Sequence, residues 1–379
     1  MQNQDSTPRS GPLCDLRVLE FSGIGPAPFA GMLLADLGAD VVRIDRPSGA
    51  DANPYDVLAR GRRSLALDLK QEADRAIALA MLGKADILIE GFRPGVMERL
   101  GLGPDIALAR NPRLIYGRMT GWGQMGPLAQ RAGHDINYIA LAGALAMIGP
   151  ADHPTPPLNL VGDFGGGALY LVMGVLAAHL HAQKTGIGQV VDCAMTDGAA
   201  SLLAMFHGFR AMGFMAAPRG ANLLDGGAHF YRTYQCADGR FIAVGAIEPQ
   251  FYAALREKLG LTDDPAFDAQ MDATQWPALS ARLSEIFRQA PRDHWAELFA
   301  TSDACVTPVL EPDEAISHPH MQVRQTFVEI GRVTQPGPAP RFSATPGAVR
   351  HGPVRAGEGG RAAALDWGLE PSVFNGRDA

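Results

Sequence analysis

A histidine and an aspartate, each close to glycine, are the side chains in this sequence best suited to proton transfer. His134 follows Gly133, and Asp163 comes just before a run of three glycines at residues 165–167. Each opens an apolar segment with helical spacing, where a titratable group is costly unless it is paired or used. We therefore expect an acid/base site in which His134 and Asp163 face one another across a substrate.

The same residues also have structural interpretations, which residue type and spacing leave open. A single histidine before a helix is more often a core residue, and Asp163 or Glu248 could each cap a helix N-terminus. The glycines at 165–167 could serve close helix packing as well as the close approach of a ligand. Spacing alone indicates an α/β protein with a candidate acid/base site.

The elements that must position this pair begin with a βαβ unit. A strand over residues 16–21 leads through a glycine-rich turn into a helix over 29–37 and a strand over 40–45. Further strands, each separated from the next by helical segments, are expected at 65–69, 85–90, 113–119 and 188–195. This alternation predicts a Rossmann-like domain with a parallel, doubly wound sheet. A long helix is expected after Gly167, and another over 196–212.

The glycine-rich turn imitates a dinucleotide-binding fingerprint, with Asp45 about twenty residues beyond it. However, Pro28 replaces the third glycine, and Pro26 and Pro28 remove amide donors that would hold a pyrophosphate. A nicotinamide-dependent dehydrogenase is therefore disfavoured, while the Rossmann-like fold class stands.

From residue 222 the pattern changes to a smaller α+β domain. Residues 231–236 and 240–245 predict a β-hairpin, with an Asp-Gly pair near its turn. Helices are expected to follow over 248–259, 275–290 and 292–300. From Pro336 the chain is rich in Pro, Gly, Arg and Ala, so this tail must lie on another surface or be mobile.

The composition excludes several classes of protein. The net charge of −7 argues against nucleic-acid binding. The four cysteines are scattered without a CxxC pair, which disfavours both a disulfide scaffold and a zinc site. No apolar signal segment is visible near the N-terminus, and the apolar run at 168–180 is too short to cross a bilayer. We expect a cytoplasmic protein with no membrane partner.

The chain resembles the class III CoA-transferase superfamily of CaiB/BaiF type, and within it the α-methylacyl-CoA racemases. The matching stretches are LEFSGIGP (19–26), LGADVVRIDRP (37–47), EGFRPG (90–95), GWGQ (121–124), GHDINY (133–138), NLVGDFGGG (159–167), GAIEPQFY (245–252) and SDACVTPV (302–309). They extend over most of the chain, and together they are specific. The first dozen residues and the segment after about residue 344 are poorly covered.

The resemblance implies an interlocked homodimer of linked, ring-like subunits. Its large Rossmann-like, CoA-binding domain would comprise 1–197 and 325–379, and the small α+β domain 228–310. A linker helix would span 198–227, and a return linker 311–324. The active site would lie between the large domain of one subunit and the small domain of the other.

The resemblance also assigns roles to residues. His134 and Asp163 become the acid/base pair, acting on the S and R faces of the substrate, and Glu248 becomes the carboxylate that supports His134. The backbone N–H of Asp135 and its neighbours would hold the enolate oxygen. Candidates for binding CoA are Arg46, Arg62 (with Arg60 and Arg63), Arg93, Asn159 and Tyr138. The substrate would be a 2-methylacyl-CoA thioester, with no metal and no separate cofactor.

Two other activities remain open within this resemblance. A CoA transferase would use Asp163 as a nucleophile on the thioester carbonyl, and it would not need His134 together with Glu248. A non-catalytic CoA-binding protein would need neither. The joint presence of all three residues favours the racemase.

Overall fold

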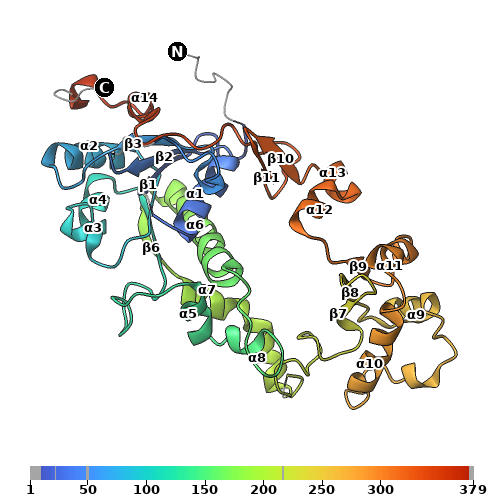
Figure 1. The fold of residues 1–379 in the computed structure, drawn as a ribbon. Coiled ribbons are helices and arrows are strands. Elements are labelled where there is room, and N and C mark those ends of the chain that lie inside the picture. Colours follow the sequence, from blue (N-terminus) through green and yellow to red (C-terminus); the bar gives the residue numbers. More distant parts are fainter. Residues whose placement is uncertain (1–9, 22, 48–50, 216, 375–379) are drawn as a thin grey trace. The chain divides into compact units, whose positions relative to one another are not determined.

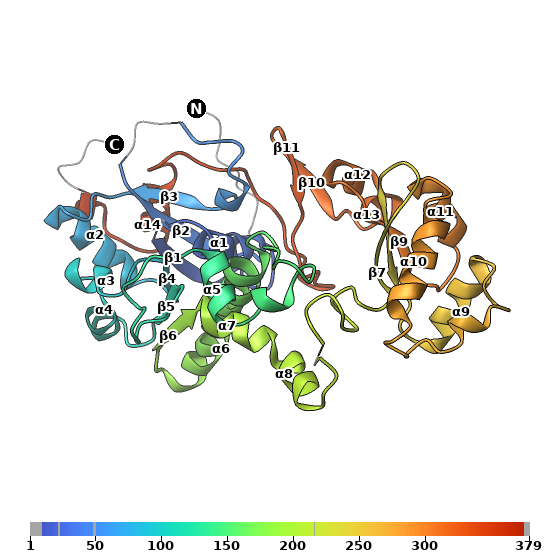
Figure 2. The ribbon, with the colours of Figure 1, turned by 60° about the horizontal axis from the view of Figure 1, so that its bottom comes forward.

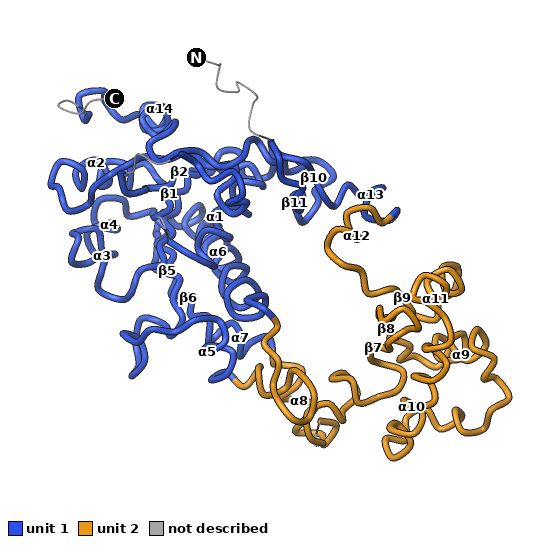
Figure 3. Tube along the Cα trace, viewed as in Figure 1, with its two compact units in different colours: residues 1–142, 158–202, 319–379 blue, residues 143–157, 203–318 orange. Residues whose placement is uncertain are grey.

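The computed structural model describes residues 10–21, 23–47, 51–215 and 217–374. Residues 1–9, the motif residue Ser22 and the end of the tail lie outside this range. The chain divides into two compact units (Figure 3), of which the first comprises Met1–Ala142, Leu158–Leu202 and Pro319–Ala379. The second comprises Gly143–Pro157 and Leu203–His318. Its segment 143–157 had been expected in the large domain.

A parallel sheet forms the centre of the first unit (Figure 1). Its strands are β1 (Arg17–Phe21), β2 (Asp40–Asp45), β3 (Arg63–Ala66), β4 (Ile87–Glu90), β5 (Ile115–Thr120) and β6 (Gln189–Ala194). They lie side by side in the order β3-β2-β1-β4-β5-β6, and every neighbouring pair is parallel. This order is that of a doubly wound Rossmann sheet, so the expected Rossmann-like fold of the large domain is confirmed.

Both faces of this sheet are buried, because alternate residues of each strand enter different cores. Leu19 and Phe21 of β1 join one hydrophobic cluster, whereas Val18 joins the other. In β4, Leu88 faces the first cluster and Ile89 the second. A strand that is buried on both faces consists of consecutive apolar residues, so these strands could be predicted from the sequence.

Helices cover the two faces of the sheet (Figure 1). On one side lie α2 (Glu72–Leu82), α3 (Val96–Arg99) and α4 (Pro104–Arg110), and on the other lie α1 (Pro26–Asp36), α6 (Leu169–Thr185) and α7 (Met195–Leu202). α1 begins earlier than expected, because proline at the first helical positions needs no intrahelical N–H partner. A short η1 (Val57–Ala59) precedes β3.

The helix expected after Gly167 is longer than the sequence suggested. A π-helix, η3 (Leu160–Ala168), continues directly into α6, giving a helical run over Leu160–Thr185. By length and composition alone this run could cross a membrane, so the expectation that it is too short is wrong. Its inner face is nevertheless part of the core, where Leu171, Val175 and Ala178 are buried.

The second unit is built on an antiparallel sheet of β7 (Tyr231–Gln235), β8 (Phe241–Gly245) and β9 (Val306–Pro308). Its helices are α8 (Ala204–Ala211), α9 (Pro249–Lys258), α10 (Trp276–Phe287), α11 (Arg292–Phe299) and α12 (Pro312–Ser317), with short η2 (Leu145–Met147) and η4 (Pro265–Phe267). The predicted hairpin and small α+β domain are confirmed. The expected helix over 196–212 is wrong in one respect, since it breaks at Leu203 into α7 and α8.

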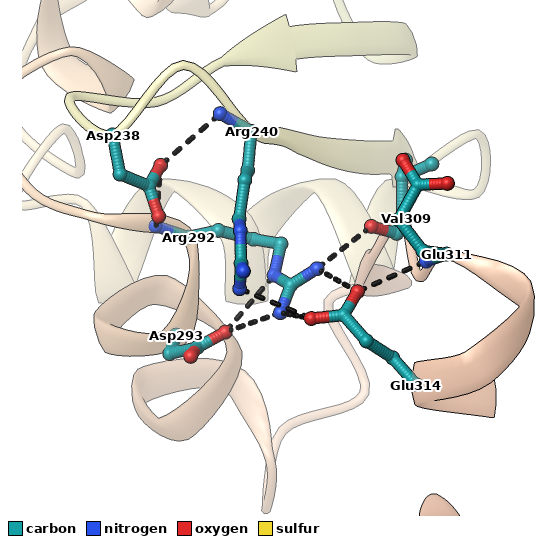
Figure 4. A network of polar contacts seen from close by, with 7 residues as sticks. All are labelled: Asp238, Arg240, Arg292, Asp293, Val309, Glu311 and Glu314. Carbon is teal, nitrogen blue, oxygen red and sulfur yellow. Dashed lines mark hydrogen bonds and ion pairs between the residues drawn. The ribbon is translucent and has the colours of Figure 1, made fainter. Parts of the chain in front are cut away.

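A buried arginine fixes the last helix of the second unit (Figure 4). Arg292, in the first turn of α11, donates to both carboxylate oxygens of Glu314 in α12 and to the carbonyl of Val309. Arg240 adds a further bond to Glu314. The hydrogen bonds from Arg292 lower the pKa of Glu314 to about 2. These contacts attach α12, the last helix of the second unit, to α11 and to the hairpin.

The C-terminal tail packs on the first unit. Of the two expectations for the tail, packing on another surface is therefore confirmed for its described residues. The tail begins with α13 (Pro319–Val323) and a hairpin of β10 (Phe327–Ile330) and β11 (Val333–Pro336). It then runs along β3, where the backbone N–H of Ser64 donates to the backbone carbonyl of Glu358. Figure 2 shows α14 (Gly360–Asp366) beside β3, and η5 (Pro371–Phe374) follows. Trp367 is buried in the core, so this part of the tail is integral to the fold.

Candidate active site

The candidate site lies where the order of the sheet reverses. β1 and β4 are neighbours at this point, but the connections from them run to opposite sides, and in doubly wound folds a crevice commonly lies beyond the carboxyl ends of such strands. Gly25 follows β1 and caps α1, while Arg93 follows β4. Ligands of doubly wound proteins bind at this position, so the residues near it are candidates for a binding or active site.

His134 stands at the N-terminus of α5 (Asp135–Leu141), as its spacing predicted. Its backbone is extended, and its N–H donates to the side-chain oxygen of Asn137 at 3.0 Å. The imidazole is exposed rather than packed in a core. The interpretation of His134 as a buried core residue is therefore wrong, and its side chain is available to a ligand.

Tyr138 explains why glycine precedes His134. Its ring packs so closely on Gly133 and Gly121 that a β-carbon at either position would collide with it. Its hydroxyl donates to the Gly133 carbonyl at 2.5 Å, and Trp122 meets the ring edge-on. Tyr138 had been expected to bind CoA; here it is buried and fixes the backbone that carries His134.

Asp163 lies inside the π-helix η3, not at a helix cap. The wider turn of a π-helix is rare and is often found at functional sites. The glycines that follow allow it to pack closely, because a β-carbon on Gly166 would meet the Ala199 backbone of α7 at 2.7 Å. The glycine run thus serves helix packing, and this packing holds Asp163 in place.

Two side chains contact Asp163 directly. The carboxylate of Asp135 accepts a hydrogen bond from the Asp163 backbone N–H at 2.6 Å. The amide of Asn159 donates to the Asp163 carboxylate at 3.2 Å. Asn159 had been expected to bind CoA, but its observed contact is with the acid/base candidate itself. The first unit therefore brings His134, Asp135, Asn159 and Asp163 together.

The environment of Asp163 favours its protonated form. Partial burial raises the pKa of this carboxyl above its ordinary value of 3.8, and the negative charge of Asp135 raises it further. The Asn159 hydrogen bond and the nearby His134 act in the opposite direction. A rise in pKa is the direction that general acid/base catalysis requires of a carboxyl that must donate a proton as well as accept one.

Gly25 makes room for Asp163. A β-carbon on Gly25 would lie 3.2 Å from the Asp163 carboxylate, and its φ of 73° is a conformation that side chains disfavour. The glycine-rich turn that imitates a dinucleotide motif therefore approaches the carboxyl of Asp163. Sequence reasoning missed this role, because the turn and Asp163 are far apart along the chain.

The expected arginine ligands have different environments. Arg62 is fully buried and donates to both oxygens of Glu20, at 2.6 and 2.5 Å, so it is not available to a phosphate. That expectation is corrected, because the sequence shows the charge but not its distant partner. Arg60 is likewise buried against Asp36. Arg46 and Arg93 are exposed, and their contact with CoA stays a prediction.

Glu248 belongs to the second unit, where it precedes the first residue of α9 and is exposed. Burial raises the pKa of the Cys305 thiol, and the negative charge of Glu248 raises it further. The pairing of Glu248 with His134 stays a prediction. Among the described residues, no group of three or more His, Cys, Asp or Glu side chains is placed to hold a metal ion.

A doubly wound α/β fold, with His134 and Asp163 in its first unit, defines the general class of this protein. Its residues 13–358 match the model of CoA-transferase family III. It is 47% identical to the alpha-methylacyl-CoA racemase of Mus musculus and 46% identical to that of Homo sapiens, in each case over 87% of this chain and 86% of the relative. A crystal structure of a CAIB/BAIF family protein from Brucella suis superposes with a TM-score of 0.81 at 25% identity, covering 95% of this chain and all of that one.

The chain belongs to CoA-transferase family III. The resemblance stated from its motifs is thereby confirmed.

Proposed function

We propose that the protein is a racemase that interconverts the (2R)- and (2S)-forms of 2-methylacyl-CoA thioesters. The observation that carries the proposal is the placement of His134 and Asp163 in one unit, next to the crevice of the sheet, with the pKa of Asp163 raised. The identity of 47% to a racemase over most of both chains supports the same activity.

The α-hydrogen of a thioester is weakly acidic, so inversion requires a base on one face of the carbon and an acid on the other. His134 removes or returns the proton on the S face, and Asp163 on the R face. The two exchange roles according to the enantiomer bound. The negative charge then resides on the thioester oxygen, as an enolate. Its donors are the first N–H groups of α5, beginning with Asp135, which precede the intrahelical bonds.

No metal or separate cofactor takes part in this scheme, since CoA is part of the substrate. Arg46 and Arg93 bind its phosphates, for which a guanidinium is well suited. Burial and the charge of Asp163 raise the pKa of Tyr138, and the charge of Arg93 opposes this shift, so Arg93 lies near the residue that supports His134. The protein acts in the cytoplasm, without a membrane or nucleic-acid partner.

The working form is an interlocked homodimer, in which Glu248 of the partner subunit accepts a hydrogen bond from the far nitrogen of His134. This bond fixes the tautomer of the imidazole and favours its protonated form. An exposed apolar stripe on α6 supports association: Leu169, Met173 and Leu180 are each more than half exposed. Such a patch commonly marks a protein interface.

Incubation with a single enantiomer of a 2-methylacyl-CoA in deuterated water tests the activity. We expect loss of optical activity together with incorporation of α-deuterium. His134→Ala should block proton removal from the S enantiomer, and Asp163→Asn from the R enantiomer. A CoA transferase of the same family would instead pass CoA to an added acid without exchange, and that result would refute the racemase.

A further inference from the structure

A cavity of about 690 Å³ lies within the second unit. Its walls come from the strands β7 and β8, from Cys305 and Thr307 at β9, and from the segments 149–151 and 220–226. All of these residues belong to one compact unit, so the cavity is formed by that unit alone. Its volume is typical of sites for small molecules.

Arg232 supplies a positive charge to this cavity. Its guanidinium lies over the ring of Tyr234, 5.5 Å from the ring centre, which orients it. Its Nε is shielded from solvent and has no hydrogen-bond partner among the described residues. A donor withdrawn from water and left unpaired is costly, and an acceptor in the cavity would remove that cost.

The other charged residue of the wall, Asp225, is already satisfied. Its carboxylate accepts bonds from the backbone N–H groups of Gly220, Asn222 and Gly227 and from the side-chain amide of Asn222. It therefore has little capacity left for Arg232. Its negative charge does disfavour a dianionic ligand such as a phosphate, so a singly charged carboxylate is the better match.

Cys305 connects this cavity to the proposed catalytic residues. This exposed residue lines the cavity together with Gly245, whose N–H donates to the Cys305 carbonyl at 2.9 Å, and Glu248 follows Gly245 closely in the chain. The cavity thus adjoins the carboxylate that supports His134 in the proposed mechanism. A group bound here would be attached to a substrate whose reacting carbon lies near Glu248.

We propose that this cavity binds a carboxylate at the far end of the acyl chain, and that Arg232 holds it. The inference rests on the proposed function and deepens it: the substrates include 2-methylacyl-CoA thioesters that carry a second, distal carboxylate. Arg232 is then the residue that selects them. A planar guanidinium can donate two parallel hydrogen bonds to such a group.

Protection of Cys305 from alkylation measures binding at this site without any turnover. The full-length protein is treated with iodoacetamide, and labelling of the Cys305 peptide is followed by mass spectrometry. Glutaryl-, adipyl- and suberyl-CoA are compared with valeryl-, hexanoyl- and octanoyl-CoA. We expect at least one carboxylated thioester to slow labelling roughly tenfold more than its uncharged counterpart. Arg232→Met should abolish the difference, and Arg210→Met, on the exposed surface of α8, should preserve it.

Equal protection by charged and uncharged thioesters, or a difference that survives in Arg232→Met, would overturn the proposal. Protection by free glutarate but by no carboxylated thioester would also overturn it, because the ligand would then not be an acyl chain. Arg232→Lys keeps the charge without the planar pair of donors and should retain only part of the effect. If protection is seen but no α-deuterium exchange occurs with any substrate, the racemase is wrong and the cavity assignment stands.

Discussion

The carboxylate of Asp135 holds the backbone of Asp163 through a hydrogen bond of 2.6 Å. Asp135 is also the residue next to His134, so one side chain connects the helix that follows His134 to the π-helix that carries Asp163. A β-carbon on Gly162 would lie 2.6 Å from the same carboxylate oxygen, which explains the glycine at that position. A short series of contacts thus determines how far apart His134 and Asp163 lie.

Replacing Asp135 by asparagine should shift the pH dependence of one direction of the reaction. Its negative charge contributes to the raised pKa of Asp163, so Asp135→Asn lowers that pKa. The side-chain oxygen of asparagine still accepts the bond from Asp163. We expect the pH limb that reports Asp163 to move to lower pH, measured from kcat/KM for each enantiomer separately. Asp135→Ala should also destabilise the fold, by about 1 kcal/mol.

The proposed dimer can be tested by a complementation experiment. Asp163→Asn and Glu248→Ala should each be nearly inactive alone. In a heterodimer of the two, purified with different tags, one shared site would collect both changes and the other would be intact. We expect about half of the wild-type activity. If each site were formed within a single chain, both sites would carry one defect, and no activity would return.

Much of the fold could be predicted because its strands are continuous apolar runs. The residues of β2 were located as the structure has them, since Val41, Val42 and Ile44 are buried on both faces of the sheet. His134 could be proposed as a site residue because a histidine beside glycine at the start of a helix is distinctive. Asp163 was found too, although its π-helix was not, because i to i−5 bonding leaves no clear pattern in the sequence.

What could not be predicted depends on partners far apart in the chain. Arg62 belongs to a cluster of basic residues in the sequence. Only the fold shows that its guanidinium is hydrogen-bonded to the carboxylate of Glu20, 42 positions away. Asn159 and Tyr138 could not be assigned for the same reason. The segment 143–157 connects two parts of the first unit in the sequence, yet it packs in the second unit. The composition of the sequence does not change at either end of this segment, so its placement could not be predicted.

The buried pair of Glu20 and Arg62 should be sensitive to removal of one partner. Arg62→Met leaves a carboxyl that is fully buried and no longer paired, which typically costs about 3–5 kcal/mol. Burial raises the pKa of Glu20, so its charged form is the costly one, and the loss should grow as pH rises. Urea unfolding at about pH 5 and about pH 8 measures this. The double variant with Glu20→Met should recover much of the stability; an equally unstable double variant would contradict this account.

Arg219 holds the segment 143–157, which lies between His134 and Asp163 in the sequence and packs in the second unit. It donates to the carbonyls of Ala146, Pro150 and Ala151 at 2.9, 2.8 and 3.2 Å. The clamped segment ends at Pro157, two residues before Asn159, which contacts Asp163. Arg219→Ala should therefore expose residues 143–157 to limited proteolysis and slow proton exchange on the Asp163 face more than on the His134 face. Arg210→Ala, on the exposed surface of α8, is the matched control, and equal slowing on both faces would argue against the clamp.

A buried histidine should make the second unit sensitive to acid. His229 is inaccessible to solvent, and its Nε2 lies 2.7 Å from the hydroxyl of Tyr252. Burial lowers its pKa from 6.5 to about 4, so the folded protein keeps the ring neutral, whereas the unfolded chain protonates it at higher pH. This difference in pKa between the folded and unfolded states contributes to the free energy of unfolding. The contribution is fully present above pH 6.5 and is lost as the pH falls from 6.5 towards 4.

The loss should amount to about 3 kcal/mol at most over that interval. Urea unfolding across this range measures it. His229→Gln, which cannot be protonated, should give a flatter dependence on pH even if its stability at neutral pH is lower. Equal slopes for the wild type and His229→Gln would mean that other groups cause the acid sensitivity, and that the ring is not held neutral by burial.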